Sequence, residues 1–248
     1  MIDKQHLIDK DQPHIQSVMG RYGRTYYFRH DEYVGKSIFQ YGEFSPEECA
    51  YIVELASERP GEIVLDIGAN IGCVAQALLA AGHHVECFEP QPEVYKLLQL
   101  NCPSATNHNV ALGTNTGTAQ MPLVDYSKRG NFGGLGIGAG HGLRVELRTL
   151  DSYEYENVGL IKLDVEGFEE LVLRGGAETI SRCKPIIYLE ADRQEKLTSL
   201  ASYLASIGYA YTRHDPPLFC KNNFFNNPVR CWDRNYISAN WVCRYIGK

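Results

Sequence analysis

The chain has 248 residues and a formal net charge of −6, with 30 acidic and 24 basic side chains. This length can bury the core of one large α/β domain, and the charge gives no support for nucleic acid as a partner, because such binding depends on a basic face. The eight cysteines form no Cys-x-x-Cys pair, so the usual zinc-site spacing is absent and reduced thiols are expected. Without a signal peptide or an apolar run of membrane-spanning length, we expect a cytoplasmic protein of undetermined oligomeric state.

Two kinds of sequence precede the first predicted sheet strand. Residues 1–20 are polar and weakly patterned, and we interpret them as a tail or a loosely docked helix. Residues 22–44 carry eight aromatic side chains, which predict a cap packed on the main domain. A helix start is predicted at Ser45-Pro46-Glu47-Glu48, with Ser45 as the N-cap and Glu48 closing a capping box, and this helix is expected to end near Ser57.

Strand and helix patterns alternate along the rest of the chain, which predicts a doubly wound, mostly parallel seven-stranded sheet covered on both faces. The strands expected in this sheet are 62–67, 84–89, 107–112, 160–165, 185–190, 209–212 and 241–246, with accessory strands at 117–123 and 143–150. The helices expected between them are 74–79, 92–101, 168–182 and 195–207. The glycine-rich segment 128–142 is interpreted either as a lid or as a disordered surface loop.

A glycine turn follows the first of these strands, in the sequence Asp66-Ile67-Gly68-Ala69-Asn70-Ile71-Gly72. Such a turn between strand and helix is typical of backbone that passes close to a ligand. Glu89 ends the next strand, where a carboxylate suits ribose hydroxyls, and Asp164 and Glu166 end another buried strand. Ligands of open α/β sheets bind at these strand ends, so the pattern indicates a nucleoside-bearing cofactor with a site for chemistry beside it.

Two cofactor classes share this strand-turn-helix arrangement. Nicotinamide enzymes carry Gly-x-Gly-x-x-Gly, whereas this chain has Asn70 at the central position. Asp66 would repel a pyrophosphate but suits the ammonium group of a methionine, which favours S-adenosylmethionine. An NAD(P)-dependent oxidoreductase and a catalytically inactive cofactor-binding module stay open as alternatives.

Six segments occur in the order found in the FkbM family of methyltransferases, which the chain resembles from about Tyr22 to its end: DIGANIG, FEPQPEVYKLLQLN, NVALG, TLDSY, IKLDVEGFEELVLRGG and KPIIYLEAD. The resemblance implies an S-adenosylmethionine-dependent methyltransferase with a Rossmann-like class I fold, a tail and cap at residues 1–60 and the cofactor-binding domain at 61–248. It places the following residues around the donor: Asp66, Gly68, Ala69, Asn70, Gly72, Glu89, Pro90, Asn109, Val110 and Ala111. We expect Tyr41 and Glu43 of the cap to reach the cofactor as well, while Asn70 and Asn109 could instead serve only a helix cap and a turn.

Methyl transfer to an alcohol needs a base, and the strand-end position favours Asp164 and Glu166 for base and orienter. We expect both to project to the same side of an extended segment. The alternative is that they only cap the helix that starts near Gly167, with Glu169 and Glu170 complementing its dipole, and for Glu169 and Glu170 we favour this interpretation. His214 is a second candidate base.

The acceptor and a metal are less directly indicated. FkbM relatives include enzymes that methylate sugars, and the tyrosines of the cap and the loop Asn222–Pro228 suit contact with a sugar ring, so we expect a carbohydrate hydroxyl as acceptor. Glu190 and Asp192 could add ligands for Mg²⁺, although solvated surface acids are the favoured interpretation.

Overall fold

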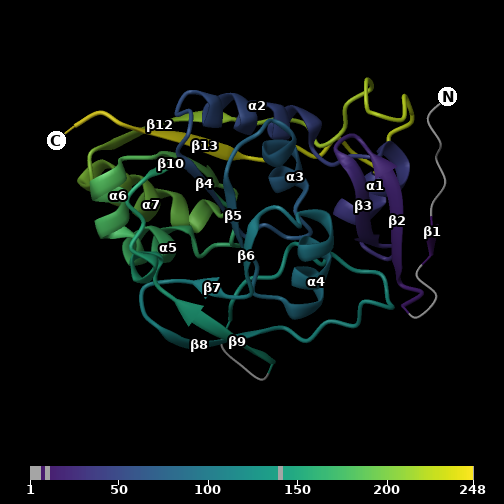
Figure 1. The fold of residues 1–248 in the computed structure, drawn as a ribbon, viewed down its shortest axis with the longest axis horizontal. Helices are drawn as coiled ribbons and strands as arrows, with labels where there is room; N and C mark the ends of the chain where they lie inside the picture. Colours follow the sequence, from purple (N-terminus) through teal and green to yellow (C-terminus); the bar gives the residue numbers. More distant parts are fainter. Residues whose placement is uncertain (1–6, 9–11, 139–141, 248) are drawn as a thin grey trace.

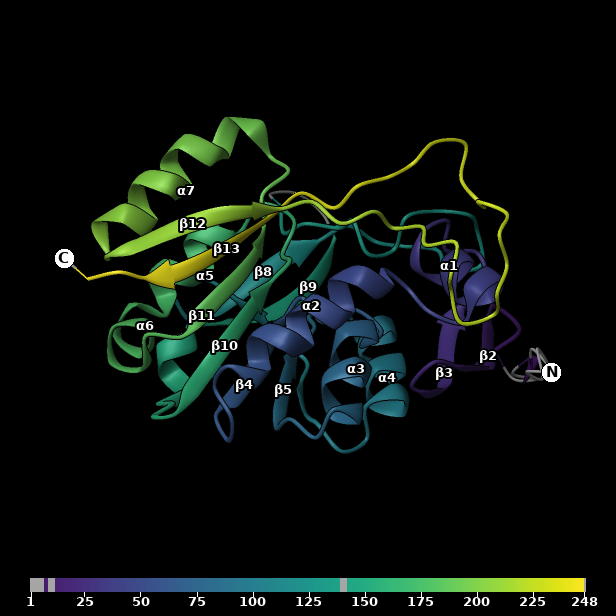
Figure 2. The ribbon, with the colours of Figure 1, turned by 90° about the horizontal axis from the view of Figure 1, so that it is seen from above.

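The computed structural model describes residues 7–8, 12–138 and 142–247. Its main sheet has seven strands, most of which are labelled side by side in Figure 2. In spatial order these are β12 (Tyr209–His214), β13 (Asn240–Tyr245), β11 (Ile186–Glu190), β10 (Val158–Leu163), β4 (Ile63–Ile67), β5 (Val85–Phe88) and β6 (Thr106–His108). The five strands from β11 to β6 pair in parallel, and β13 is antiparallel to both of its neighbours. The predicted doubly wound, mostly parallel sheet is confirmed.

Helices cover both faces of this sheet. On one face lie α2 (Pro46–Ser57), α3 (Cys73–Ala80) and α4 (Pro92–Asn101), and on the other lie α5 (Glu169–Gly175), α6 (Ala177–Cys183) and α7 (Gln194–Ser206). Neighbouring residues of β10 alternate between the faces, since Leu160 packs in the α2 and α3 layer and Ile161 in the α5 to α7 layer. Each such side chain contributes about 1.5–3 kcal/mol when fully buried. A strand buried on both faces reads as a continuous apolar run, which is why the sequence pattern located it.

Two predicted elements are wrong in their extent. The strand expected at 107–112 is divided between β6 in the main sheet and β7 (Ala111–Leu112) in a second sheet, which continues with β9 (Leu143–Arg148) and β8 (Gly117–Met121). A short 3-10 helix, Leu150–Tyr153, follows β9. The helix expected at 168–182 is divided into α5 and α6 at Gly175 and Gly176. Only glycine fits at position 175, because a Cβ there would lie 1.9 Å from the carbonyl oxygen of Gly113.

The N-terminal segment forms a small antiparallel sheet of β1 (Leu7–Ile8), β2 (Ile15–Gly20) and β3 (Gly23–Phe28), followed by α1 (Val34–Tyr41). The prediction of a tail or helix over residues 1–20 is therefore wrong for β2, while residues 1–6 and 9–11 lie outside the described part. The polar residues of β2 mask the apolar pattern of a strand, so the sequence did not predict it. Gln16 is buried and accepts a hydrogen bond from the Tyr27 hydroxyl at 2.9 Å.

The cap built by these elements lies at one end of the molecule beside α4 (Figure 1). Its apolar core joins Val18, Phe28 and Ile38 to Ile71 of the glycine turn, and also includes Phe132 and Phe225 from two later loops. The helix α2 packs on the main sheet instead. The domain division near residue 60 stays a prediction. Across the described residues, no helix combines the length and apolar character needed to cross a membrane.

Candidate functional site

Two cavities meet at the carboxyl ends of β4 and β10. The first has a volume of about 60 Å³ and contains Glu89 in its wall, and the second has about 210 Å³ and contains Lys162. We call them the Glu89 cavity and the Lys162 cavity. Both are lined by Gly68, Asn70, Gly133, Asp164 and Glu166. The site therefore lies where open α/β sheets bind their ligands.

The glycine turn separates the two cavities, and its composition follows from its backbone. Gly68, Asn70 and Gly72 all have positive φ, at 77°, 52° and 91°. Glycine adopts this conformation freely and asparagine better than most other residues. At Gly68 there is also no room, because a Cβ would lie 1.8 Å from the carbonyl oxygen of Asp164. The turn is thus pressed directly against the end of β10.

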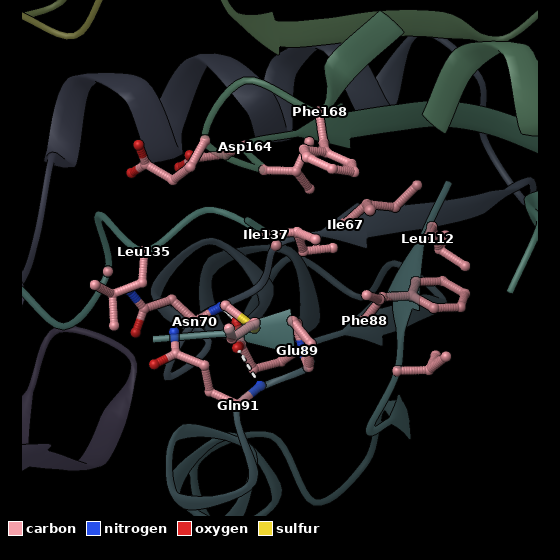
Figure 3. A pocket seen from close by; sticks show the side chains of 18 residues that line it. Ile67, Asn70, Phe88, Glu89, Gln91, Leu112, Leu135, Ile137, Asp164 and Phe168 are labelled. Carbon is pink, nitrogen blue, oxygen red and sulfur yellow. Dashed lines mark hydrogen bonds between the residues drawn. The ribbon is translucent and has the colours of Figure 1, made fainter. Parts of the chain in front are cut away.

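Glu89 is fixed in the wall of its cavity by two backbone donors. Its carboxylate accepts hydrogen bonds from the N–H groups of Asn70 at 3.0 Å and Gln91 at 2.9 Å, and Figure 3 marks the bond to Gln91. Burial raises the pKa of Glu89 to about 7, although the two donors act in the opposite direction. A carboxylate has about four acceptor positions, so two stay available for a pair of hydroxyl groups.

The rest of the Glu89 cavity is mainly apolar. Figure 3 shows Leu135 and Ile137 among its lining side chains, and both come from the glycine-rich loop. The opposite walls are formed by Ile67, Phe88, Pro90, Val110, Ala111, Leu112, Met121, Val165 and Phe168. A cavity of about 150 Å³ holds a benzene ring. At about 60 Å³ this cavity has less room than a flat aromatic base needs.

The glycine-rich loop lies across both cavities over its described residues. Phe132 is buried in the cap core, and its carbonyl oxygen accepts a hydrogen bond from the side-chain amide of Gln91 at 3.1 Å. The disordered interpretation therefore does not hold for residues 131–137, residues 139–141 lie outside the described part, and a lid function stays a prediction.

Asp66 does not line either cavity, and its contact with a cofactor stays a prediction. It is fully buried beneath the turn and pairs with Lys162, whose Nζ lies 3.1 Å from its carboxylate. The same Nζ donates a hydrogen bond to the carbonyl oxygen of Gly68 at 2.8 Å and lies 3.7 Å from Asp164. Burial opposes the charge of Lys162, but Asp66 and Asp164 outweigh it and raise the pKa of the ammonium group above its usual value. Lys162 thus joins the turn to the end of β10.

Asp164 and Glu166 both face the two cavities, but not for the predicted reason. β10 ends at Leu163, and Glu166 has a φ of 55°, so the segment is a turn and not extended. The Asp164 side chain is 44% exposed. Glu166 forms an ion pair with Arg193; burial and then Asp164 raise the pKa of Glu166 to about 7.

The acids predicted to support the next helix do so. Glu169 accepts a hydrogen bond from the N–H of Gly167 at 3.0 Å, just before α5 begins, and Glu170 pairs with Arg174 one turn along this helix. Their contacts set them apart from Asp164 and Glu166, which line the cavities.

Glu190, at the end of β11, completes a group of three carboxylates. One oxygen each from Asp164, Glu166 and Glu190 lie within 4.8 Å of one another. Burial and the nearby Asp164 raise the pKa of Glu190 to about 10, and one of its oxygens is buried without a hydrogen-bond partner. This set of oxygens suits a divalent cation such as Mg²⁺. Asp192, the other predicted ligand, lies outside the group, half-exposed beside Arg193.

The cap does reach the Lys162 cavity, through residues other than those predicted. Tyr41 and Glu43 line neither of these two cavities. The Tyr41 hydroxyl donates to the carbonyl oxygen of Val229 at 3.0 Å, and Glu43 accepts from the N–H of Phe224 at 2.7 Å. Both residues fasten the C-terminal loop to the cap. The residues that line the Lys162 cavity are Tyr33, Val34, Phe44, Ser45 and Glu48 from the N-terminal side and Leu218, Tyr236, Ile237 and Ser238 from the C-terminal side.

Sequence reasoning could have found one of these missed residues. Lys162 is a charged residue inside an otherwise apolar strand, and buried lysines are rare unless paired. No comparable signal marks Tyr33 or Tyr236.

The predicted capping box at Ser45 is also wrong: Ser45 has a φ of 44°, and its hydroxyl donates to the Glu48 carboxylate at 2.7 Å instead of accepting from the backbone.

The remaining predicted residues divide into two groups. Ala69 lines the Lys162 cavity, and Pro90, Val110 and Ala111 line the Glu89 cavity. Gly72, Asn109 and His214 line neither. The Asn109 amide donates to the carbonyl oxygens of Glu89 at 2.8 Å and Pro90 at 3.1 Å, so it shapes the turn after β5.

Comparison with known proteins agrees with this geometry. The FkbM methyltransferase domain model matches residues 66–211. The 31-O-demethyl-FK506 methyltransferase FkbM of Streptomyces tacrolimicus is 37% identical over 79 residues, which cover 31% of this chain and 29% of that protein. The crystal structure of methyltransferase FkbM from Methylobacillus flagellatus KT has 22% identity and a TM-score of 0.50, covering 73% of this chain and 43% of that one. The two matches span less than half of either FkbM protein.

A third similarity concerns the fold alone. The S-adenosylmethionine-dependent methyltransferase from Agrobacterium tumefaciens has 11% identity and a TM-score of 0.50, over 94% of this chain and 70% of that one. The family model, by contrast, covers more than half of the present sequence and includes the glycine turn, Glu89, Asp164 and Glu166. The chain therefore belongs to the FkbM methyltransferase family.

Proposed function

We propose that the protein is an S-adenosylmethionine-dependent O-methyltransferase. The observation that carries this proposal is Glu89, a carboxylate anchored by the N–H groups of Asn70 and Gln91 beside an apolar slot. Glu89 would accept both ribose hydroxyls, and the walls around Val110 and Ala111 would hold the adenine. The methionine part would lie along Gly68, Ala69 and Asn70, which would bring the methyl group toward Asp164, a lining residue of the same cavity. When bound, this cofactor supplies a methyl group activated by positive sulfur.

Asp164 is the proposed general base. It faces both cavities, so it can reach an acceptor hydroxyl in one while the donor occupies the other. A base removes the hydroxyl proton as the new C–O bond forms, and such assistance contributes about 10²–10⁴-fold. Glu166 is held by Arg193 and would orient the acceptor. Aligning the two reactants accounts for about 7–11 kcal/mol of the barrier.

The proposed acceptor is a hydroxyl of a sugar, glycan or glycosylated metabolite. The Lys162 cavity combines the rings of Tyr33 and Tyr236, 5.4 Å apart, with the polar side chains of Asn131 and Ser238. Aromatic faces beside a few polar groups suit a sugar ring. The loop Asn222–Pro228, which we also expected to contact the acceptor, does not line this cavity.

Methyl transfer from radiolabelled S-adenosylmethionine to a broad panel of sugars and glycans tests this function. We expect label in a neutral sugar, and a loss of about 10²–10⁴-fold in kcat for Asp164→Asn with donor binding retained. If every acceptor of the panel stays unlabelled, the acceptor class is wrong. Turnover by Asp164→Asn at the wild-type rate would remove Asp164 as the base.

A magnesium ion is tested in the same assay. Asp164, Glu166 and Glu190 are the residues that would hold it. Activity that disappears with a chelator and returns with Mg²⁺ supports the ion, and full activity in the chelator removes it.

A further inference from the structure

A cleft of about 470 Å³ lies between helix α7 and the strands β12 and β13, and Figure 2 shows α7 beside β12. Its sheet wall contains Tyr211 and Trp241, whose rings stack with centroids 3.8 Å apart and planes at 10° to each other. Trp241 is buried in the core, whereas Tyr211 is 42% exposed. The buried indole therefore fixes the orientation of a half-exposed phenol ring in this wall. We call the site the Tyr211 cleft.

Polar groups also line the Tyr211 cleft. The guanidinium of Arg213 pairs with the carboxylate of Asp215 at 2.9 Å. On α7, the Ser202 hydroxyl donates to the carbonyl oxygen of Thr198 at 2.8 Å, so the hydroxyl oxygen still has acceptor positions. An aromatic ring, hydroxyl groups and a charge-balanced pair suit a neutral sugar, because a sugar ring has an apolar face of C–H groups and a rim of hydroxyls.

The Tyr211 cleft and the Lys162 cavity share a wall. At the end of β11, Glu190 lines the Lys162 cavity and the next residue, Ala191, lines the cleft. At the start of β13, Asn240 lines the cleft, and its amide donates to the hydroxyl oxygen of Ser238 at 2.9 Å. Ser238 in turn lines the Lys162 cavity. Residues that are adjacent in the chain or hydrogen-bonded thus face different sites.

The distance between the two sites is short. Asp215 lines the cleft and Leu218 lines the Lys162 cavity, and three residues of chain span at most about 11 Å. This segment is tied to the one that carries Ser238, whose N–H donates to the carbonyl oxygen of Pro216 at 3.0 Å. A single sugar cannot fill both sites, but a chain of a few sugars can.

We propose that the Tyr211 cleft binds a second sugar of the acceptor, so that the acceptor is a neutral oligosaccharide or glycan chain. This rests on the proposed methyl transfer, in which the Lys162 cavity holds the reacting sugar. Asp164 and Glu166 line that cavity but not the cleft, so the cleft contributes binding and not chemistry. Binding that is equal in the ground state and the transition state changes KM and leaves kcat unchanged.

The first test contains no methyl donor, so turnover cannot occur. A panel of neutral tetrasaccharides built from hexoses, deoxyhexoses and N-acetylhexosamines is titrated calorimetrically into the protein. We expect saturable binding of at least one, weakened about tenfold in Tyr211→Ala by the loss of the aromatic contact. Tyr245→Ala, at a tyrosine of β13 that is 38% exposed and outside the cleft, should bind as the wild type does. Binding by no tetrasaccharide, or equal affinities in the two variants, contradicts the proposal.

A second variant keeps this test decisive if Tyr211→Ala does not fold. Ser202 lies at an exposed position of α7, so Ser202→Trp places a large side chain in the cleft and leaves the stack of Tyr211 on Trp241 intact. We expect tetrasaccharide affinity to fall about tenfold or more. An affinity equal to that of the wild type contradicts the proposal.

The last test compares two acceptors in the methylation assay: the tetrasaccharide that binds most tightly and the monosaccharide that corresponds to its methylated residue. The wild type should show a KM about tenfold lower for the tetrasaccharide. Tyr211→Ala should raise this KM about tenfold with unchanged kcat, and should leave the KM for the monosaccharide unchanged. Equal KM values for both acceptors in the wild type, or an equal rise for both in the variant, contradicts the role of the cleft. Tetrasaccharide binding that depends on Tyr211 without any turnover would instead contradict the proposed methyl transfer.

Discussion

The two cavities of this protein meet at one glycine turn, yet they are built in different ways. Apart from the end of β10 and the start of α5, the walls of the Glu89 cavity come from one stretch of chain, residues 67–137. The walls of the Lys162 cavity come from the cap, the turn, the ends of β10 and β11 and the C-terminal loop. The first cavity is mainly apolar with one anchored carboxylate, and the second contains several carboxyl groups and a buried lysine. A site formed mainly by one continuous stretch of chain leaves a pattern in the sequence, whereas a site formed by distant segments does not.

The largest effect is expected at Lys162, which lines its cavity and pairs with Asp66 beneath the glycine turn. Lys162→Met leaves the buried Asp66 without its partner, and breaking a buried ion pair in this way costs about 3–5 kcal/mol. Urea unfolding should show this loss in the free energy of unfolding. The double variant Lys162→Met with Asp66→Asn should recover part of it, because the uncompensated charge is removed.

The exposed pair of Lys128 and Asp125 provides the matched control for this prediction. Lys128→Met should leave the free energy of unfolding close to that of the wild type, as for surface pairs generally. Equal losses of unfolding free energy in Lys162→Met and Lys128→Met would show that the buried pair contributes no more to stability than the exposed pair.

The next effect concerns the turn that separates the cavities. Gly68→Ala should destabilise the fold by more than Gly82→Ala, although both positions have positive φ, at 77° and 86°. The backbone strain is about 1–3 kcal/mol in each case. Only Gly68 adds a clash, with the Asp164 carbonyl oxygen, while no atom lies near a Cβ on Gly82. Thermal unfolding measures both, and similar shifts would exclude the close approach.

The pH dependence of donor binding tests the role of Glu89, which lines only one of the two cavities. Glu89 has a pKa raised to about 7, so its carboxylate predominates above this pH and the acid below it. Binding of S-adenosylmethionine should therefore weaken as the pH falls below about 7, by at most about tenfold per unit. Calorimetric titration at several pH values measures this, and Glu89→Gln should show no such dependence. A wild-type affinity that is constant through this range would rule out a carboxylate of Glu89 as a donor ligand.

The same raised pKa predicts that the stability of the free protein, unlike donor binding, decreases as the pH rises. A carboxyl group whose pKa is higher in the folded state contributes stability below its ordinary pKa, and this contribution is lost as the pH rises through about 7. Glu89→Gln should remove that part of the pH dependence in urea unfolding. An unchanged profile in the variant would assign the dependence to other groups.

The smallest effect is expected at the outer wall of the Glu89 cavity. Leu135→Ala removes part of the side chain that narrows this cavity to about 60 Å³. Stopped-flow measurement should find that S-adenosylmethionine associates a few-fold faster. The affinity should change little, because the lost apolar contact offsets the easier entry. Leu123→Ala, at an exposed site, provides the control. Equal association rates in both variants would exclude the loop as a barrier to entry.

Prediction from sequence succeeded where the information is local. The apolar run before Asp66 and the turn Gly68-Ala69-Asn70 specified a strand, a turn and a helix, and Glu89 follows from the next strand end. Prediction failed where the structure depends on contacts between distant parts of the chain. An apolar run through Val110 gave no sign that the chain passes from one sheet to another, and the pairing of Asp66 with Lys162 depends on two strands far apart in sequence.

The cap shows the same limit. Aromatic residues predicted that a cap exists, but not which of them turn inward. Tyr41 was expected at the cofactor and instead holds the C-terminal loop, whereas Tyr33, with the same composition signal, lines the Lys162 cavity.

The most direct test of the account is calorimetric titration of the purified protein with S-adenosylmethionine and, separately, with NAD. We predict binding of S-adenosylmethionine alone, weakened by more than about tenfold in Glu89→Ala, since hydrogen bonds to a charged group contribute about 1.5–3 kcal/mol. Glu93→Ala, in the first turn of α4 and paired with Lys96, should bind as the wild type does. Binding of NAD without binding of S-adenosylmethionine would contradict the assigned cofactor and, with it, the proposed methyl transfer.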